Sequence, residues 1–463
     1  MSQSSLTNQL RQRVSWGSLR HHYWTLAGHL SRCNRLWHLE EREFRHLAIK
    51  DLWQFMRRHD PSVIGETRAR ASEALHWLFR GQEATPDDGV SMGYFPVSGL
   101  EAPWRPSYPE TTGYIIVTLL EYGSLFQHTQ AQRRARAMGH WEAAIQMPSG
   151  AVQGGTLAAP ARQTPAVFNT GMVLQGWTAL LERGWDETLA RAATRAADFL
   201  VADQGADGHF RTHGEFVRQD RIKTYNVLCA WPLYRLGLLM DHAGYRDAAI
   251  RSARAAMAMQ QDNGWFAHND LTRPEAPLTH TLGYTLQGLL EVGQLAGDDA
   301  MIQAVARGLE PLLARVDHRG FLHGRFDDQW HPACFSSCLT GSAQIAIVSY
   351  RMHQITQTPH HRTLADRMVN FLKGLQQIAT PHPGIRGALA GSHPMFPGSY
   401  MTAGYPNWAT KYFLDALMLQ ERLTHPSGST MKSQTCSCGR PSFADDHSTT
   451  ACSPPDDAPP TPR

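Results

Sequence analysis

The segment Gln260-Gln261-Asp262-Asn263-Gly264-Trp265-Phe266 follows an apolar helix end at Met257, and its pattern recurs along the chain. The clearest second copy is Gln204-Gly205-Ala206-Asp207-Gly208-His209-Phe210, which follows Phe199-Leu200. Partial copies keep the Gln, the Gly or the aromatic residue: Gln82 with Gly89 and Tyr94-Phe95, Gln146 with Gly150, Arg319-Gly320-Phe321, and Gln376 with Gly384. The Gln positions are 64, 58 and 56 residues apart, and then about twice 58 across the copy that lacks Gln. A fixed period of this length is typical of a repeat architecture.

A second pattern with the same period opens an apolar helix after each of these turns. Its six copies are Thr112-Gly113-Tyr114, Thr170-Gly171, Thr224-Tyr225-Asn226, Leu282-Gly283-Tyr284, Thr340-Gly341 and Asn407-Trp408-Ala409. The Gly positions, or the residues that replace them, are 58, 55, 57, 58 and 68 residues apart. Each period therefore has room for two helices of ordinary length and a loop.

The two helices of a period differ in character. Residues 173–181 are apolar nearly all round, as expected of a buried inner helix, whereas residues 187–200 are amphipathic, as expected of an outer one. Six such hairpins can close into a ring, and Gly or Ala at the inner starts would let neighbouring helices approach closely. The sequence therefore predicts an all-α fold, an (α/α)6 toroid at residues 61–425. A helical extension is predicted at 1–60 and a disordered tail, rich in Ser, Thr, Pro and Asp, at 427–463.

Composition excludes several classes of partner. The formal charge is only +3, so neither nucleic acid nor an anionic membrane surface is an expected partner. No stretch of 18 apolar residues is present to span a membrane. The first 30 residues show no signal-peptide pattern and the seven cysteines are scattered, which favours a cytoplasmic location.

The Gln…Asp-Gly-x-Phe and Gln…Asn-Gly-Trp-Phe copies resemble the repeats of prenyltransferases, terpene cyclases and six-hairpin glycosidases, all of them α/α-toroids. The last third resembles an uncharacterised bacterial group associated with surface-polysaccharide and glycoconjugate biosynthesis. That resemblance rests on Cys338-Leu339-Thr340-Gly341-Ser342-Ala343-Gln344, Gly391-Ser392-His393-Pro394 and Tyr405-Pro406-Asn407-Trp408-Ala409. It implies a glycan or glycoconjugate substrate and polysaccharide-synthesis proteins as partners.

The chain departs from the better-known toroid enzymes in its acidic and metal-binding motifs. Asp87-Asp88 and Asp327-Asp328 lack the flanking acids of the terpene cyclase motifs, and no Cys-His-Gly element is present. Cys334 and Cys338 are expected to be ordinary buried thiols. We therefore expect no metal and no cofactor.

In such a toroid the N-termini of the inner helices point to one mouth of a central cavity, where their free N–H groups can contact a ligand. We therefore predict that residues ahead of each inner start, together with parts of the preceding loops, form the site. The predicted catalytic residues are Glu110, Asp220, Tyr225 and His280. The predicted substrate-binding residues are Tyr108, Asn169, Lys223, Asn226, Trp265, Asp328, His331, Arg386, His393, Tyr405 and Asn407.

Two kinds of carbohydrate chemistry fit these side chains. Hydrolysis needs two carboxyl groups, for which Glu110 could pair with Asp220, Asp270 or Asp328. Elimination or epimerisation of a uronate needs a proton-transfer group, for which Tyr225, His280, Tyr405 or Lys223 could serve. The leading hypothesis is a carbohydrate-active hydrolase, lyase or epimerase. The alternatives are a non-catalytic toroid that binds glycan or protein, and a prenyltransferase or terpene cyclase-like enzyme.

Overall fold

The computed structural model describes residues 42–96, 102–214 and 221–425. Part of the predicted N-terminal extension is described, as helix α3 (Arg42–Met56). Residues 1–41 and the predicted tail at 427–463 lie outside the described residues.

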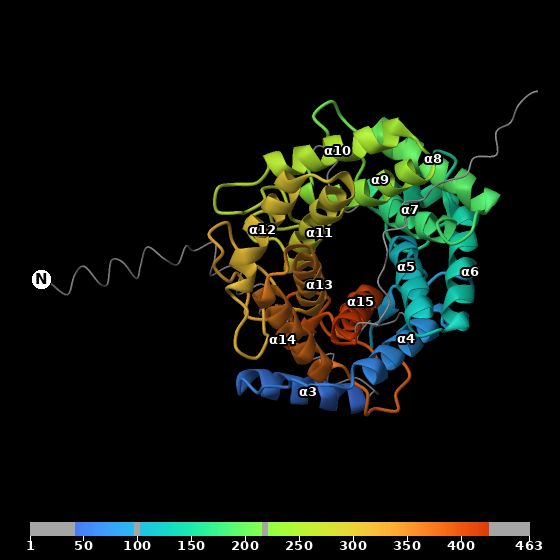
Figure 1. The fold of residues 1–463 in the computed structure, drawn as a ribbon. Coiled ribbons are helices and arrows are strands. Elements are labelled where there is room, and N and C mark those ends of the chain that lie inside the picture. The colour runs from blue at the N-terminus through green and yellow to red at the C-terminus, as the bar shows by residue number, and fades with distance from the viewer. Residues whose placement is uncertain (1–41, 97–101, 215–220, 426–463) are drawn as a thin grey trace, which may run out of the picture. The chain divides into compact units, whose positions relative to one another are not determined.

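The described chain is a ring of helical hairpins (Figure 1). The outer helices are α4 (Thr67–Glu83), α6 (Thr129–Ile145), α8 (Glu187–Asp203), α10 (Ala243–Ala258), α12 (Asp299–Leu313) and α14 (Pro359–Leu375). The inner helices are α5 (Pro109–Leu125), α7 (Val167–Leu181), α9 (Ala230–Leu239), α11 (Thr279–Ala296), α13 (Leu339–Thr356) and α15 (Asn407–Thr424). The 3-10 helix η2 (Thr224–Cys229) precedes α9 directly, and a second one, η1 (Pro160–Arg162), lies in a loop.

Each inner helix packs on the next, and the last one, α15, packs on α4 and α5, so the ring is closed. The predicted (α/α)6 toroid is therefore confirmed. The helices α5, α7 and α11 begin three residues before the motifs that predicted them, whereas α9 begins after its motif, which forms η2. Thr112 and Thr170 lie in the first turns of α5 and α7 and accept hydrogen bonds from the loop N–H groups of Val90 and Val152. None of the described helices has the length and apolar character that a membrane-spanning segment needs.

The Nε2 of the repeated Gln links an outer helix to the next one in four copies, at Gln146, Gln204, Gln260 and Gln376. The Nε2 of Gln260 donates to the carbonyls of Gly264, in its own turn, and of Ala304, in the following outer helix, at 3.3 and 2.8 Å. Gln204 makes the equivalent pair of bonds with Gly208 and Ala248. Repetition of the motif thus reflects repetition of one hydrogen-bonded joint between outer helices.

The same joint closes the ring. Gln376, at the end of α14, donates to the carbonyls of Arg70 in α4 and of Gly387. The sequence pattern assigned Gly384 to this copy, and that assignment was wrong. Gly387 has a φ of 86°, and a Cβ there would lie 2.1 Å from the carbonyl oxygen of Glu73 in α4, so only glycine fits.

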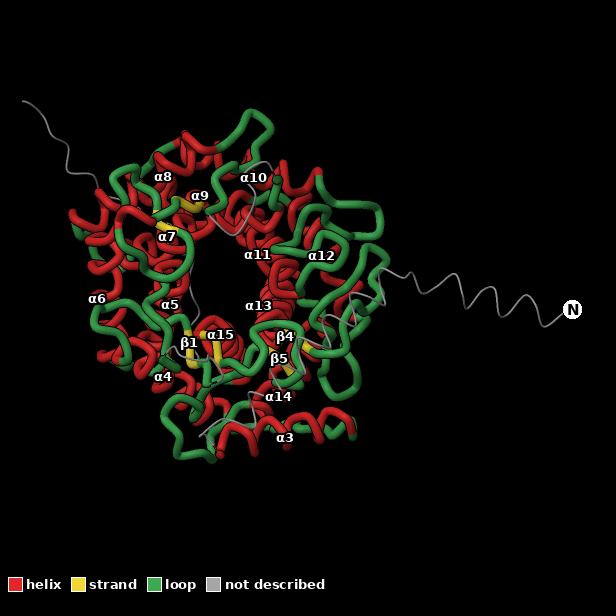
Figure 2. Tube along the Cα trace, turned by 180° about the vertical axis from the view of Figure 1, so that it is seen from behind, coloured by secondary structure: helices red, strands yellow, loops and turns green. Residues whose placement is uncertain are grey.

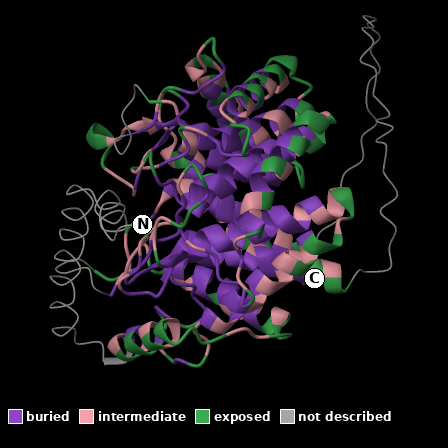
Figure 3. Ribbon diagram, turned by 90° about the vertical axis from the view of Figure 1, so that its left-hand side faces the viewer, coloured by how far each residue is buried: buried purple, intermediate pink, exposed green. Residues whose placement is uncertain are grey.

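Glycines also allow the inner helices to pack closely. A Cβ on Gly113 of α5 would lie 2.5 Å from the Cα of Val173 in α7, and one on Gly341 of α13 would lie 2.7 Å from the backbone nitrogen of His280 in α11. Buried residues make up the interior of the ribbon, and exposed residues lie toward its outer parts (Figure 3). The packing reason predicted for these small residues is confirmed.

Three short antiparallel strand pairs join the loops that precede inner helices (Figure 2). They are β1 (Gly93–Tyr94) with β6 (Tyr405–Pro406), β2 (Val152–Gln153) with β3 (Pro165–Ala166), and β4 (Ser337–Cys338) with β5 (Ser392–His393). The first pair joins the first and last loops of the ring and so adds to its closure.

Candidate functional site

A cavity of about 520 Å³ lies where the inner helices begin. Five of the six inner starts contribute to its lining: Tyr108 and Glu110 before and in α5, Phe168 and Asn169 in α7, Tyr225 in η2, Leu278, His280 and Tyr284 at α11, and Trp408 in α15. Loop residues complete the wall: Met92, Gly154, Gly155, Thr156, His213, Leu271, Thr272, Arg325, Tyr400 and Met401. The volume is within the range of about 300–1,000 Å³ that is common for small-molecule sites.

Aromatic rings line much of the wall. On one side Phe168 lies between Tyr225 and Tyr284, with ring centroids 5.3 and 4.7 Å away. His280 lies 4.4 Å from Tyr284 and 5.5 Å from Tyr400 by the same measure. Trp408 continues the wall between Tyr400 and Tyr108, at 6.5 and 6.0 Å. Such a wall offers apolar faces together with hydroxyl groups.

Glu110 is the one carboxyl group among the described residues that line the cavity. Glu110 is partly exposed, and protein surrounds its side chain on the other sides. Burial raises the pKa of this carboxyl to about 8, although a hydrogen bond from the Tyr108 hydroxyl acts to lower it. At neutral pH the group is therefore mainly protonated. A carboxyl in this state can give a proton to a bound molecule.

His280 lies across the ring from Glu110, since α5 and α11 are separated by two inner helices on either side. Burial lowers the pKa of His280 to about 4, against a hydrogen bond with Gln344 that raises it. The imidazole is therefore neutral at pH 7. The cavity thus holds a protonated acid on one side and an uncharged base on the other.

Other polar groups in the wall are held by the surrounding backbone. The Nδ2 of Asn169 donates to the carbonyl of Gln153 at 2.9 Å. His213 Nε2 donates to the carbonyl of Arg221 at 2.6 Å, and Nη1 of Arg325 donates to that of Ala276 at 2.6 Å. Burial raises the pKa of Tyr225 above the ordinary value of a tyrosine, and the charge of Glu110 is the second cause of the increase. The phenol of Tyr225 is therefore protonated at neutral pH.

Five of the residues predicted from the sequence are therefore brought together in the cavity: Tyr108, Glu110, Asn169, Tyr225 and His280. Asp220 lies outside the described residues. The other nine predicted residues are described and do not line the cavity.

Lys223, Asn226 and Asn407 are buried behind the wall. Lys223 Nζ lies 2.9 Å from Oδ2 of Asp270 in a buried ion pair, and neither residue is part of the cavity lining. Asn226 Nδ2 bonds His213 Nδ1 at 3.2 Å, and Asn407 Nδ2 bonds the carbonyl of Ser91 at 2.8 Å. These side chains hold loops to the inner helices.

Tyr405 and His393 face the core on the side of α3. The Tyr405 hydroxyl lies 3.5 Å from the sulfur of Met395, and the ring packs edge-on against Phe44 of α3. His393 Nδ1 lies 2.6 Å from Oδ1 of Asp51, also in α3. Their strand positions turn both side chains away from the cavity.

The remaining predicted residues belong to turns under or on the outer surface. Trp265 is buried edge-on against Trp330, with centroids 5.0 Å apart. Asp328 and His331 are exposed in the following turn, and Arg386 is exposed and ion-paired with Glu73 at 2.6 Å. The Asp-Gly-aromatic turns pack against outer helices, so residues near them do not reach the central space.

Sequence reasoning missed Arg325, Tyr400, His213 and the loop around Thr156. These residues come from long loops that have no common period, so neither of the two repeat patterns points to them. Their place in the wall depends on loop paths that only the folded ring defines.

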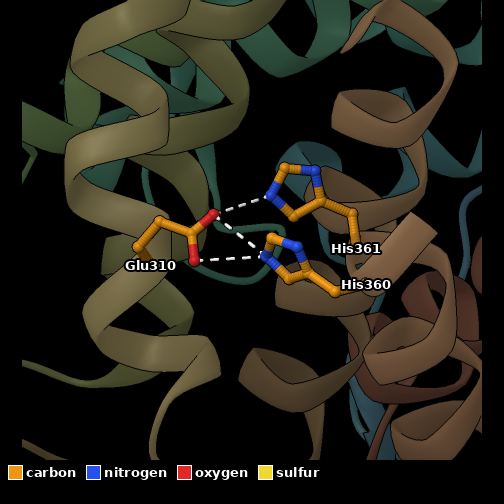
Figure 4. Close-up of side chains that lie close together, drawn as sticks. All are labelled: Glu310, His360 and His361. Carbon is orange, nitrogen blue, oxygen red and sulfur yellow. Dashed lines mark hydrogen bonds and ion pairs between the residues drawn. The ribbon is translucent and has the colours of Figure 1, made fainter. Parts of the chain in front are cut away.

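A separate cluster on the outer surface contains three residues with metal-binding side chains. Glu310 of α12 contacts His360 and His361 at the start of α14, and the ligand atoms of all three lie within 4.8 Å of one another (Figure 4). His361 Nε2 lies 2.8 Å from Glu310 Oε1, but its buried Nδ1 has no partner in the described structure. Because a metal-bound imidazole normally donates a hydrogen bond from its other nitrogen, we interpret the cluster as a hydrogen-bonded joint between α12 and α14.

No protein-family model matches the chain, and no curated protein matches it. Among solved structures it is similar to an unsaturated glucuronyl hydrolase from Bacillus sp. GL1, with 16% identity and a TM-score of 0.61 over 78% of this chain and 97% of that one. An unsaturated glucuronyl hydrolase specific for heparin gives 15% identity and 0.62 over 77% and 97%. A D-mannose isomerase gives 10% and 0.60 over 77% and 97%.

The chain thus shares the (α/α)6 toroid fold of these structures, as the repeats predicted. The similarity establishes the fold, and identities of this size leave the reaction to be argued from the cavity itself.

Proposed function

We propose that this protein is a carbohydrate-active enzyme that binds one sugar unit of a polysaccharide or glycoconjugate in the central cavity and exchanges protons with it through Glu110 and His280. The observation that carries the proposal is the pairing of a carboxyl whose pKa is raised to about 8 with an imidazole whose pKa is lowered to about 4, on opposite sides of one cavity.

The composition of the wall supports a sugar ligand. Tyr225, Trp408 and their aromatic neighbours offer flat faces for the C–H surfaces of a sugar ring, while Asn169, His213 and the tyrosine hydroxyls offer polar groups for its hydroxyls. A prenyl ligand would favour a wall of aliphatic and aromatic residues alone. A non-catalytic scaffold would not need an open cavity with an acid and a base.

The acid and base favour lyase or epimerase chemistry over hydrolysis by two carboxyl groups. In either reaction His280 would take a proton from a sugar carbon. Glu110 would then return a proton to the opposite face of that carbon, which inverts it, or give one to a leaving oxygen, which completes an elimination. Two carboxyl groups, as a glycosidase uses, are not found in the described lining.

The experiment is a panel of neutral and uronate-containing oligosaccharides incubated with the protein in deuterated water. Products are followed as new reducing ends, as the ultraviolet absorbance of an unsaturated uronate, and as deuterium incorporated at a sugar carbon. We expect turnover that Glu110→Gln and His280→Asn reduce by about 10²–10⁴-fold. The matched controls Asp328→Asn and His331→Asn, at exposed positions outside the cavity, should keep the wild-type rate.

If the protein binds glycans without turnover, and the cavity variants do not change this binding, the protein is a glycan-binding protein and the proposed enzymatic function is wrong. Turnover that survives both cavity variants would show that the reaction occurs elsewhere.

A further inference from the structure

Arg325 is a buried cation without a counter-ion in the described structure. Only 8% of the residue is exposed, yet it lines the cavity. The one hydrogen bond of its side chain goes from Nη1 to the carbonyl of Ala276, and no described carboxylate forms an ion pair with it. Glu275, the one carboxylate among the groups that raise the pKa of Arg325, is already paired with Arg273 at 3.0 Å.

The backbone of Arg325 is paired with the segment that leads into α11, the helix that carries the proposed base. Arg325 forms a β-bridge with Leu278, two residues before His280, and Thr279 N donates to the carbonyl of Gly324 at 3.0 Å. On its other side, Ala333 N donates to the carbonyl of Arg325 at 2.9 Å. The charge of Arg325 also acts on Tyr400, whose ring lies beside that of His280 in the cavity wall. Burial raises the pKa of Tyr400, and Arg325 is one of the groups that lower it.

A cation held in this way carries a desolvation cost that a ligand can offset. Burial is the main cause that lowers the pKa of Arg325, but a guanidinium remains charged at neutral pH. Most of its N–H donors have no acceptor in the described structure. A planar anion in the cavity would accept two of them at once and would remove the cost of the unpaired charge.

The charges of the lining indicate what kind of anion fits. Burial keeps Glu110 protonated, and it keeps His213 and His280 neutral by lowering the pKa of each. Arg325 is therefore the one charged group of the described lining at neutral pH. A single positive charge matches a monoanion such as a carboxylate better than a phosphate dianion.

We propose that Arg325 binds the carboxylate of the substrate and that the sugar taken by this cavity is a uronic acid. This inference rests on the proposed function and names its substrate class. Bound in this way, the carbon that carries the carboxylate would lie on the same side of the cavity as His280, and neutralisation of the carboxylate would make its C–H proton easier to remove.

The test is calorimetric binding of matched sugars, which does not depend on turnover. The probes are glucuronate, galacturonate and mannuronate, the hexoses glucose, galactose and mannose, and the corresponding hexose 6-phosphates. We expect the wild-type protein to bind at least one uronate about 10–100-fold more tightly than its hexose, the worth of one charge-assisted contact. The preference should disappear in Arg325→Met, remain in part in Arg325→Lys, and be unchanged in the control Arg273→Met.

A wild-type protein with no preference for a uronate, tighter binding of a hexose phosphate, or no binding of any probe would overturn the inference. So would a preference that survives in a folded Arg325→Met variant. The two proposals fail separately. Turnover of neutral sugars alone would support the proposed enzyme and contradict the uronate-binding role of Arg325. An Arg325-dependent preference for a uronate without turnover would support that role and contradict the proposed enzyme.

Discussion

The Nδ1 atom of His280 lies 2.7 Å from the Oε1 atom of Gln344, across the contact between α11 and α13. An amide oxygen accepts a hydrogen bond from the ring N–H, so Nε2 is the unprotonated nitrogen of the neutral imidazole. This one contact defines which nitrogen can act as a base. It also stabilises the protonated form, because it raises the pKa of His280 while burial lowers it.

The first prediction concerns the pH dependence of kcat/KM. His280 is the base and must be neutral, so activity should rise with pH through about 4, and Glu110 is the acid and must be protonated, so activity should fall through about 8. In Gln344→Leu the pKa of His280 should fall, and the acidic limb should move to lower pH while the alkaline limb stays. An acidic limb that stays in place or moves upward would exclude His280 as its source.

The second prediction concerns the buried ion pair of Lys223 and Asp270, which holds the loop that carries Leu271 and Thr272 into the cavity wall. Lys223→Met or Asp270→Asn alone should lower the free energy of unfolding by about 3–5 kcal/mol, since each leaves a buried charge without its partner. The double variant should lose less than the sum of the single variants and should mainly raise KM. Urea unfolding and steady-state kinetics measure both effects, and strictly additive losses would show that the two groups do not interact.

The third prediction concerns Glu142, a fully buried carboxyl in α6 whose two oxygens have no hydrogen-bond partner in the described structure. Burial raises its pKa well above 4.5. Below the pKa that Glu142 has in the unfolded chain, its carboxyl lowers the free energy of unfolding only slightly. This destabilisation grows as the pH rises from that value toward the pKa of Glu142 in the folded protein. Glu142→Met should therefore stabilise the protein by about 1–3 kcal/mol at neutral pH and by less near pH 5. Urea unfolding at both pH values tests this, and a variant less stable than wild type at neutral pH would contradict it.

The fourth prediction concerns Gly341, whose added Cβ would lie 2.1 Å from Oγ1 of Thr279 and 2.7 Å from the backbone nitrogen of His280. Gly341→Ala should cost about 1–3 kcal/mol by overpacking, and because it pushes on the start of α11 it should also lower kcat. Gly184→Ala is the matched control, since its nearest atom is 3.9 Å away. Equal stability and activity of the two variants would mean that the inner helices have more room than the structure shows.

The sequence could predict the fold because the same physical joint is repeated. Gln260 and its equivalents bond to the next outer helix, and Gly113 and Gly341 let inner helices touch, so each copy needs the same residue types. The error at Gly384 arose because the last turn is longer, and spacing alone could not distinguish it from Gly387.

The site was only partly predictable. Glu110 and His280 follow from the rule that inner N-termini converge on one mouth, and both line the cavity. Tyr405 and Asn407 obey the same rule in sequence, but strand pairing and a buried hydrogen bond turn them away. Arg325 and Tyr400 come from loops without periodicity, and their positions depend on contacts between segments far apart in the chain.

The most direct measurement is the titration of the Glu110 carboxyl by ¹³C NMR, with the signal assigned by its loss in Glu110→Gln. It needs no substrate. We predict a midpoint near 8, so that the group is mainly protonated at neutral pH. A midpoint near 4.5, the value of an ordinary glutamate, would contradict the account, because the cavity would then hold a carboxylate and no acid.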